Sequence, residues 1–245
     1  MAHPIVGFEI TGTDVGALCA FYDGLFGWSV VGAGTAGDAV EVDTNGGTGL
    51  TGRIVTAAAG SGSAVSIGVP DLRAALDAVV AAGGSVSSGA VEAGSGASAR
   101  FADPAGNAAR LVASIRAARP SPGAGAPVTY VEVFGPGLFG PGGLLAFYTG
   151  LFGWAPLHGQ TGGVPYVQVD PGRGDVVAAI GDDGRGTSRV VLYAAVAELG
   201  PFCDKASALG GSVAVPPTDV DGTVQFAHLT DPQGTTVGVW RKRSG

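Results

Sequence analysis

Two short stretches rich in β-branched and aromatic residues, Ile5–Ile10 and Val128–Phe134, each predict a β-strand. After the first stretch the pattern changes. Apolar residues of segment 15–26 recur at helical spacing, which predicts an amphipathic helix there. Asp14 stands where a helix N-cap is expected, and Gly27 stands where the helix should end.

The rest of the first half contains one more helix and several strands. This second helix is predicted to begin after Asp71 and to end at Gly83-Gly84. The other strands predicted in this half are Trp28–Val31, Asp38–Asp43, Leu50–Thr56, Ala64–Val69, Ser85–Ser88, Ala99–Ala102 and Ala108–Ser114. Each helix is therefore preceded by one strand and followed by three.

The second half of the chain repeats the first. The segment Phe21-Tyr22-Asp23-Gly24-Leu25-Phe26-Gly27-Trp28 returns as Phe147-Tyr148-Thr149-Gly150-Leu151-Phe152-Gly153-Trp154. The turn Asp103-Pro104-Ala105-Gly106 returns as Asp231-Pro232-Gln233-Gly234, and Gly83-Gly84 returns as Gly210-Gly211. Landmarks in the same order at nearly constant spacing indicate a duplication.

This duplication predicts two tandem domains. The segment between the copies is rich in Pro, Gly and Ala, as linkers are. We therefore expect domains at 1–116 and 127–245, joined by a linker at 117–126. Four strand–helix–three-strand motifs, two in each domain, place the chain in the α+β class.

Composition narrows the possible functions. With 45 Gly and 15 Pro but 46% hydrophobic residues, the chain is expected to fold, with many tight turns. Its net charge of −7 and its lack of a basic cluster beyond the terminal Arg241-Lys242-Arg243 argue against a nucleic-acid partner. No apolar stretch approaches the ~20 residues of a membrane span, and the start does not resemble a signal peptide. We therefore expect a cytoplasmic protein with no membrane partner, in which Cys19 and Cys203 stay reduced.

The two motifs that end the first helix and precede the last strand of each copy resemble those of the vicinal oxygen chelate superfamily. This superfamily includes glyoxalase I, extradiol dioxygenases and bleomycin-resistance proteins. The closest likeness is to tandem-domain actinobacterial proteins of this type. The resemblance covers nearly the whole chain and implies open, cup-shaped sheets. It says little about the reaction, because one fold hosts many chemistries.

In metal-using members of this superfamily, three positions of each copy supply the ligands. Carried onto this chain, they fall at Gly7 and Tyr130, near Ala64 and Val191 within one or two residues, and at Arg110 and Gly238. A tyrosine alone does not hold a divalent ion, since such a site needs several convergent donors. We therefore expect no metal and no cofactor. A metalloenzyme would instead need unusual ligands, for example His158 and His228 converging in one cleft.

Strand alternation selects candidate ligand-binding residues. If Gly7 and Tyr130 face the cup, Glu9 and Glu132 face it too. Each carboxylate could bind a cationic or donor group or act as a base, or it could simply form an ion pair with a residue such as Arg110 or Arg100. Arg110 could instead hold an anionic group. The second copy is richer in polar side chains on its predicted strands: Tyr130, Tyr166, Gln168, Gln225 and His228.

Three functional hypotheses follow. The first is metal-independent binding of a small aromatic or cationic natural product, as in resistance by sequestration. The second is a metal-independent tailoring enzyme that abstracts a proton, isomerises or cyclises, with Glu132 or His228 as catalytic base. The third is a glyoxalase- or dioxygenase-like metalloenzyme. The chain would be a monomer whose halves pair about a pseudo-two-fold axis, or a homodimer.

Overall fold

The computed structural model describes residues 2–33, 39–57, 60–93, 96–159 and 164–243. Its helices are α1 (Val15–Phe26), α2 (Leu72–Ala81), α3 (Leu144–Phe152) and α4 (Gly200–Ala208). The strands of the first half are β1 (Ile5–Gly12), β2 (Ser29–Ala33), β3 (Ala39–Asp43), β4 (Gly52–Thr56), β5 (Gly62–Gly68), β6 (Ser85–Ala93), β7 (Gly96–Ala102) and β8 (Ala108–Val112). Those of the second half are β9 (Val128–Phe134), β10 (Ala155–Gly159), β11 (Tyr166–Asp170), β12 (Val177–Gly181), β13 (Arg189–Ala195), β14 (Ser212–Val220), β15 (Val224–Thr230) and β16 (Thr236–Lys242).

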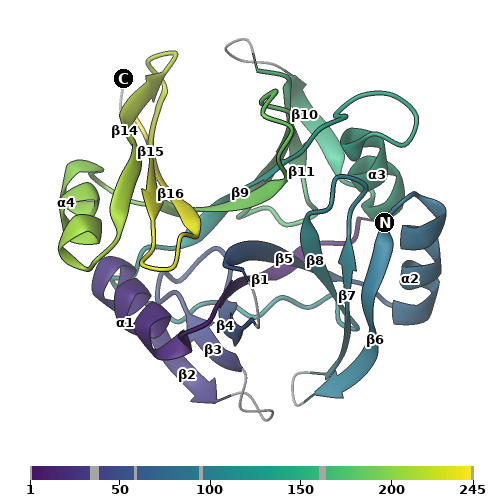
Figure 1. Cartoon of the computed structure of the whole chain (residues 1–245), viewed down its shortest axis with the longest axis horizontal. Helices are drawn as coiled ribbons and strands as arrows, with labels where there is room; N and C mark the ends of the chain where they lie inside the picture. Colours follow the sequence, from purple (N-terminus) through teal and green to yellow (C-terminus); the bar gives the residue numbers. More distant parts are fainter. Residues whose placement is uncertain (1, 34–38, 58–59, 94–95, 160–163, 244–245) are drawn as a thin grey trace. The chain divides into compact units, whose positions relative to one another are not determined.

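These strands form two eight-stranded sheets, one from each half of the chain (Figure 1). The strand orders are β2-β3-β4-β1-β5-β8-β7-β6 and β10-β11-β12-β9-β13-β16-β15-β14. The two orders are identical once the numbers are shifted by eight, so the duplication in sequence is a duplication in topology. The prediction of an α+β fold with two tandem copies is confirmed. Among the described residues, no helix is long and apolar enough to cross a membrane.

The helices begin and end where the sequence predicts. The Asp14 side chain accepts a hydrogen bond from the Ala17 amide at 2.9 Å, and Asp71 caps α2 in the same way. Gly27 follows α1 with a φ of 71°, a left-handed conformation that a side chain would strain. The strands differ more. β6 and β7 continue well beyond the predicted Ser85–Ser88 and Ala99–Ala102, because small and polar residues can extend a hairpin in which half the side chains face solvent.

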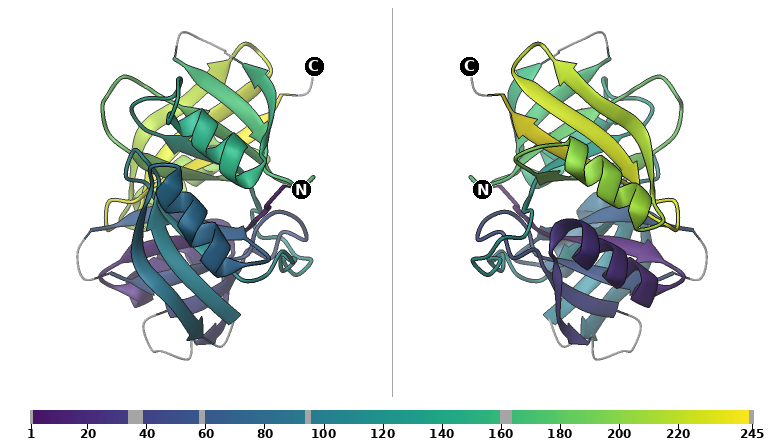
Figure 2. Two further views of the ribbon diagram at one scale, coloured as in Figure 1. Left: turned by 90° about the vertical axis from the view of Figure 1, so that its right-hand side faces the viewer. Right: turned by 90° about the vertical axis from the view of Figure 1, so that its left-hand side faces the viewer.

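The chain divides into two compact units whose boundaries run through strands β1, β5, β9 and β13 and through the segment between the two halves. Unit 1 contains residues 1–8, 64–118 and 131–190, and unit 2 contains residues 9–63, 119–130 and 191–245. Each unit therefore combines a helical motif from the first half of the chain with one from the second. In unit 2, α1 lies beside α4, with the Phe26 and Phe202 rings 5.9 Å apart (Figure 2). The domain boundaries expected from the duplication, 1–116 and 127–245, remain a proposal.

Within each unit, a buried hydrogen bond joins the two repeated motifs across the halves of the chain. In unit 2 the Tyr22 hydroxyl donates to Asp231 at 2.9 Å, and in unit 1 the Tyr148 hydroxyl donates to Asp103 at 2.9 Å. Burial and the adjacent carboxylate raise the pKa of each tyrosine, so both phenols keep their protons. The motif Phe-Tyr-x-x-Leu-Phe-Gly-Trp and the turn Asp-Pro-x-Gly thus recur together because each is the other's partner.

Candidate functional site

Unit 2 contains a chain of aromatic rings on strands β9, β13, β15 and β16. We call it the aromatic cluster: Tyr130, Tyr193, Phe226, His228 and Trp240. The Tyr130 ring lies edge-on to Tyr193, with centroids 5.6 Å apart, and 5.9 Å from Trp240. His228 continues the chain, with centroids 5.6 Å from Tyr193 and 5.2 Å from Phe226. Tyr130, Phe226, His228 and Trp240 are half-buried, so the cluster reaches the surface of unit 2.

A hydrogen bond joins the two polar rings at the centre of this cluster. The Tyr193 hydroxyl oxygen lies 2.7 Å from His228 Nε2. Tyr193 is 4% exposed, so other protein atoms surround it almost completely. Residues that lie opposite each other in a β-ladder project from the same face, and both Tyr193 and His228 lie opposite Gly238.

Gly238 makes room for the Tyr193 ring. A Cβ atom at this position would lie 2.0 Å from Tyr193 Cδ1, a distance that no side chain tolerates. The family pattern places a metal-ligand position of the fold at Gly238. In this protein that position is filled by the aromatic ring of a neighbouring strand. Even the smallest ligating side chain there would displace Tyr193.

The first half of the chain inverts this arrangement. Arg110 and Ser66 lie opposite each other in strands β8 and β5 of unit 1, at the positions that Gly238 and Tyr193 hold in the second half. In the first half the large side chain, Arg110, is on the last strand, β8, and the small one, Ser66, is on the neighbouring strand β5. Arg110 is 5% exposed, and its guanidinium donates to Ser98 Oγ at 3.0 Å. The two copies have therefore diverged at equivalent positions.

A second polar group lies in unit 1, on strands β9 and β11. The Tyr166 hydroxyl donates to Glu132 Oε1 at 3.2 Å. Burial raises the pKa of Tyr166, although a hydrogen bond with Gln168 acts in the opposite direction, so the phenol stays protonated at neutral pH. The Tyr166 ring also lies 6.5 Å from Phe134, and the Arg189 guanidinium carbon lies 4.3 Å from the Phe134 ring centroid. This group offers a carboxylate held by a neutral donor.

Glu9 is fully buried and belongs to an ion-pair network in unit 2. Arg53 on β4 approaches Glu9 with Nη1 at 3.2 Å, and it approaches Glu41 with Nε at 2.9 Å. A buried carboxylate needs such compensation, since burial alone disfavours its charge. The sequence analysis named Arg110 and Arg100 as possible ion-pair residues and did not name Arg53. The geometry of Glu9 fits an ion pair in the fold.

The predicted binding residues thus fall into separate groups. Tyr130 and His228 lie together in the aromatic cluster of unit 2, whereas Glu132, Tyr166 and Gln168 lie together in unit 1. Gln225 belongs to unit 2, and its Oε1 accepts a hydrogen bond from Arg241 Nε at 2.9 Å. Arg241 is also paired with Glu198 at 2.7 Å, so Gln225 helps to hold a surface cation.

Sequence reasoning missed Tyr193 and Trp240. Both residues could have been predicted from the sequence, because alternation along a strand places every second residue on the same face. Tyr193 lies two residues beyond Val191, within the stated uncertainty of the second ligand position, and Trp240 lies two beyond Gly238. The signal that was lacking was the register of the neighbouring strands, which only the sheet supplies.

The side chains at the fold's metal positions do not fit a metal ion in either copy. As carried over from the family pattern, they are Gly7, Arg110 and a residue near Ala64 in the first copy, and Tyr130, Gly238 and a residue near Val191 in the second. Ser66 and Tyr193, two residues further along, lie opposite Arg110 and Gly238 in the sheets. Neither set supplies the convergent imidazole and carboxylate donors that such ions require. Across the described parts of the chain, no three His, Cys, Asp or Glu side chains gather as a metal site. The side chain of His158, named above as a possible ligand, lies outside the described residues.

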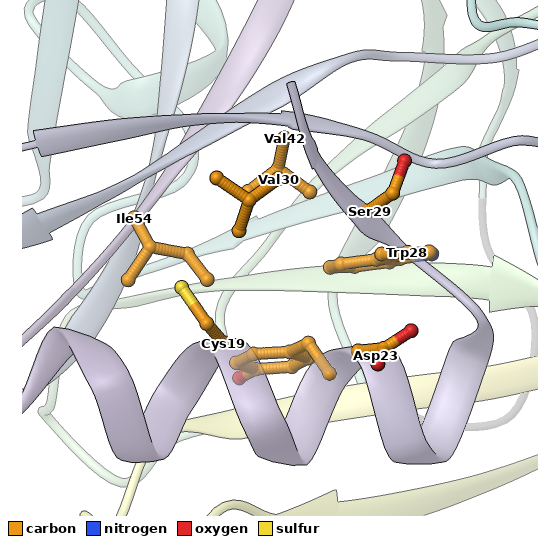
Figure 3. Close-up of a pocket in the computed structure, with 8 residues that line it drawn as sticks. Cys19, Asp23, Trp28, Ser29, Val30, Val42 and Ile54 are labelled. Atoms are coloured by element: carbon orange, nitrogen blue, oxygen red, sulfur yellow. The ribbon is translucent and has the colours of Figure 1, made fainter. Parts of the chain in front are cut away.

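A narrow crevice lies between α1 and strands β2–β4 in unit 2 (Figure 3). Cys19 and Asp23 on the helix face Val30, Val42 and Ile54 across it. The space measures about 160 Å³ including open solvent, but it has no room for a water molecule. Burial also raises the pKa of the Cys19 thiol, which disfavours the reactive thiolate. We assign no ligand to this crevice.

Solved structures share this fold across nearly the whole chain. A Mn(II)-bound glyoxalase from Novosphingobium aromaticivorans superposes with a TM-score of 0.73 at 15% identity, covering 98% of this chain and 82% of the other. The 2,3-dioxygenase LapB from Pseudomonas sp. KL28 superposes with a TM-score of 0.70 at 14% identity, covering 100% of this chain and 96% of the other. At such low identity these likenesses concern the fold alone.

Closer relatives cover less of the chain. The anthracycline biosynthesis proteins DauV, from Streptomyces sp. (strain C5), and DnrV, from Streptomyces peucetius, are each 30% identical over 112 residues. The match spans 39% of this chain and 41% of each relative, so the chain covers about two fifths of their length.

Two family models match the two halves of the chain in turn. A glyoxalase-like domain matches residues 8–112, and the glyoxalase/bleomycin resistance protein/dioxygenase superfamily matches residues 143–239. The predicted resemblance is therefore confirmed. Because the matches together span most of the chain, and each falls on one of the two repeated sheets, this protein belongs to the glyoxalase/bleomycin resistance protein/dioxygenase superfamily, the vicinal oxygen chelate superfamily.

Proposed function

We propose that this protein binds a planar aromatic natural product at the aromatic cluster, without a metal ion. The observation that carries this proposal is the set of rings around Gly238 in unit 2. Tyr130 and Gly238 stand where the family pattern expects metal ligands, the Tyr193 ring fills the space over Gly238, and the Tyr130 and Tyr193 ring centroids lie 5.6 Å apart. This part of unit 2 thus presents flat apolar faces and a phenol–imidazole pair.

The chemistry of the cluster favours a flat, uncharged or cationic ligand. Stacked and edge-to-face ring pairs contribute about 0.5–1.5 kcal/mol each beyond the burial of their area. Half-buried Tyr130 and Trp240 offer such faces, and His228 offers a polar edge. The net charge of −7 repels anions and attracts cations to the protein as a whole.

The relatives support a role connected with natural products. DauV and DnrV are named as anthracycline biosynthesis proteins, and anthracyclines contain fused planar aromatic rings that carry carbonyl oxygens. The proposed ligand class is therefore a fused-ring aromatic ketone or quinone. In this proposal the protein acts as a monomer whose halves pair through the buried Tyr–Asp bonds.

Tryptophan fluorescence tests this proposal. Trp28 and Trp154 are buried, whereas Trp240 is half-buried in the aromatic cluster, so ligand binding should quench Trp240 most strongly. We expect saturable quenching by 9,10-anthraquinone in protein treated with EDTA. The variant Trp240→Phe should lose most of the signal, whereas Trp28→Phe, the matched control, should keep it. Absence of saturable binding, or binding that requires added metal, would contradict the proposal.

A metal-independent tailoring enzyme is the second candidate function. It is favoured by Glu132, whose carboxylate is held by a neutral phenol in unit 1 and could accept a proton from a bound substrate. If the protein is such an enzyme, Glu132→Gln should lower the rate of the catalysed reaction and leave the affinity for the substrate nearly unchanged. In a protein that only binds, the same variant has no turnover to lose. Incubation with 1-tetralone, an aromatic ketone with exchangeable C–H bonds beside its carbonyl, in D2O followed by mass spectrometry separates the two, because only an enzyme with a general base accelerates deuterium uptake.

A further inference from the structure

We propose that Lys242 is a specificity-determining residue, whose ammonium group binds a carbonyl oxygen at the edge of a ligand stacked on the aromatic cluster. This inference rests on the proposed function and narrows its ligand class. The rings alone would accept both uncharged and cationic aromatic molecules, whereas a lysine beside them favours uncharged ones that carry an oxygen acceptor.

Lys242 shares a face of the sheet with the aromatic cluster. It is the middle residue of the basic run Arg241-Lys242-Arg243 at the end of β16. Successive residues of a strand point to opposite faces. Arg241 lies opposite Gln225 in the ladder with β15 and donates a hydrogen bond to it, so these two side chains share one face. Lys242 therefore points to the other face, together with Trp240 two residues before it.

The two arginines of this run are neutralised by carboxylates, whereas the lysine is not. Arg241 pairs with Glu198 at 2.7 Å, and Arg243 pairs with Asp219. Among the residues that the structure describes, no such ion pair forms at Lys242. Strand alternation thus leaves one cation of the run uncompensated, and this cation lies on the face of the cluster.

The neighbours of Lys242 on this face of the sheet are apolar. Val224 lies opposite Lys242 in the ladder of β15 and β16, and Val220 lies opposite Val224 in the next ladder. The Lys242 side chain is exposed. Because β16 is an inner strand, between β13 and β15, the lysine is not needed there to keep a sheet edge from pairing with another chain. Its N–H groups are therefore open to a ligand.

The spacing of Lys242 and Trp240 suits a ligand that spans both residues. Two residues further along a strand is a distance of about 6.6–6.8 Å, and a flat molecule of three fused rings is longer than this. A ligand stacked on Trp240 therefore brings one edge to the lysine. The net charge of −7 attracts cations to the protein, but salt screens charges that lie more than about 8 Å away. At the cluster itself, Lys242 attracts an oxygen acceptor and repels a cation.

Three flat three-ring probes test this selectivity: 9,10-anthraquinone with two carbonyl acceptors, anthracene with none, and the cation 10-methylacridinium. Their affinities for the full-length protein are measured by equilibrium dialysis at about 0.15 M salt, where long-range attraction is screened. We expect the wild type to bind the quinone roughly fivefold more tightly than anthracene, as one net hydrogen bond provides. We expect 10-methylacridinium to bind more weakly than anthracene.

Variants of Lys242 separate its role from that of the rings. Lys242→Met keeps an apolar side chain without the charge, so it should bind the quinone and anthracene about equally and should bind 10-methylacridinium more tightly than the wild type does. Lys242→Arg should keep the preference for the quinone. Lys205→Met is the matched control, because it removes the same charge from an exposed lysine on helix α4, and it should keep the affinities of the wild type.

The possible outcomes distinguish this inference from the proposed function. Equal binding of the quinone and anthracene to the wild type would overturn the role of Lys242, as would a quinone preference that survives in Lys242→Met. Loss of this preference in Lys205→Met as well would show that net charge, and not the position of Lys242, sets the selectivity. Failure of all three probes to bind the wild type would refute the proposed function together with this inference.

Discussion

Replacing Tyr22 or Tyr148 by Phe removes one hydroxyl from a buried bond between the two halves of the chain. The Phe ring keeps the stacking of the native Tyr ring, which lies 5.2 Å from Trp28 in one unit and 4.8 Å from Trp154 in the other. The substitution therefore tests the hydrogen bond with little change in packing. A hydrogen bond to a charged group contributes about 1.5–3 kcal/mol, and leaving a buried acceptor unsatisfied costs more than losing an exposed one.

The two sites differ in what remains after the hydroxyl is removed. Asp103 Oδ2 still accepts a hydrogen bond from Asn107 Nδ2 at 2.9 Å once Tyr148 is replaced. Asp231 uses its other oxygen, Oδ1, to accept from the Gln233 and Thr235 amides, and Oδ2 accepts from Tyr22. We therefore expect Tyr22→Phe to lower the free energy of unfolding by about 3 kcal/mol and Tyr148→Phe by about 1.5 kcal/mol.

Urea denaturation at neutral pH measures this difference, with the two variants serving as controls for each other. Tryptophan fluorescence and far-ultraviolet circular dichroism should be followed together, because two compact units need not unfold in one step. The midpoints should fall in the order wild type, Tyr148→Phe, Tyr22→Phe, with similar slopes. A cost below about 0.5 kcal/mol for Tyr22→Phe, or the reverse order, would show that these bonds do not join the halves as described.

Three further predictions concern packing, pH and the duplication. Gly238→Ala should destabilise the protein by about 3 kcal/mol, because the added methyl group overlaps the Tyr193 ring. Adding Tyr193→Ala to this variant should restore part of the lost thermal midpoint. A double variant with no higher midpoint than Gly238→Ala would contradict the overlap. Burial tends to raise the pKa of Asp43, but hydrogen bonds from Ser121 and Asn45 outweigh this effect and lower it. The stability that ionised Asp43 contributes is therefore complete above the ordinary Asp pKa and is lost as pH falls through the lowered value. In Asp43→Asn, the free energy of unfolding should fall less steeply than in the wild type below about pH 4. An unchanged dependence of the free energy of unfolding on pH would contradict this assignment. Segments 1–116 and 127–245 should each fail to give a stable monomer when produced alone, because each lacks the residues of the other segment that complete the Tyr–Asp bonds. When the two segments are co-expressed, size-exclusion chromatography should show a stable complex. Two stable separate monomers would contradict this view.

Local patterns were enough to predict the helices of this fold and the presence of its strands, but not the full length of β6 and β7. Asp14, Asp71 and Gly27 act through their own neighbours in sequence, so capping and helix ends could be predicted without tertiary information. The duplicated motifs identified the superfamily for the same reason: they are contiguous stretches of sequence. The assignment of Gly7, Arg110 and Gly238 to the family's metal-ligand positions likewise needed only the family pattern, and it stays a prediction.

What lies at those positions was decided by the tertiary structure. The collision of a Cβ at Gly238 with Tyr193, the pairing of Glu9 with Arg53, and the bond between Tyr22 and Asp231 all join residues far apart in the chain. Such contacts depend on strand register and on which motif packs against which, and a one-residue change of register would turn every side chain of a strand to the other face. The sequence by itself determined which segments become strands and helices. Only the folded sheets determined that a phenol and an imidazole, 35 residues apart in the chain, meet beside Gly238.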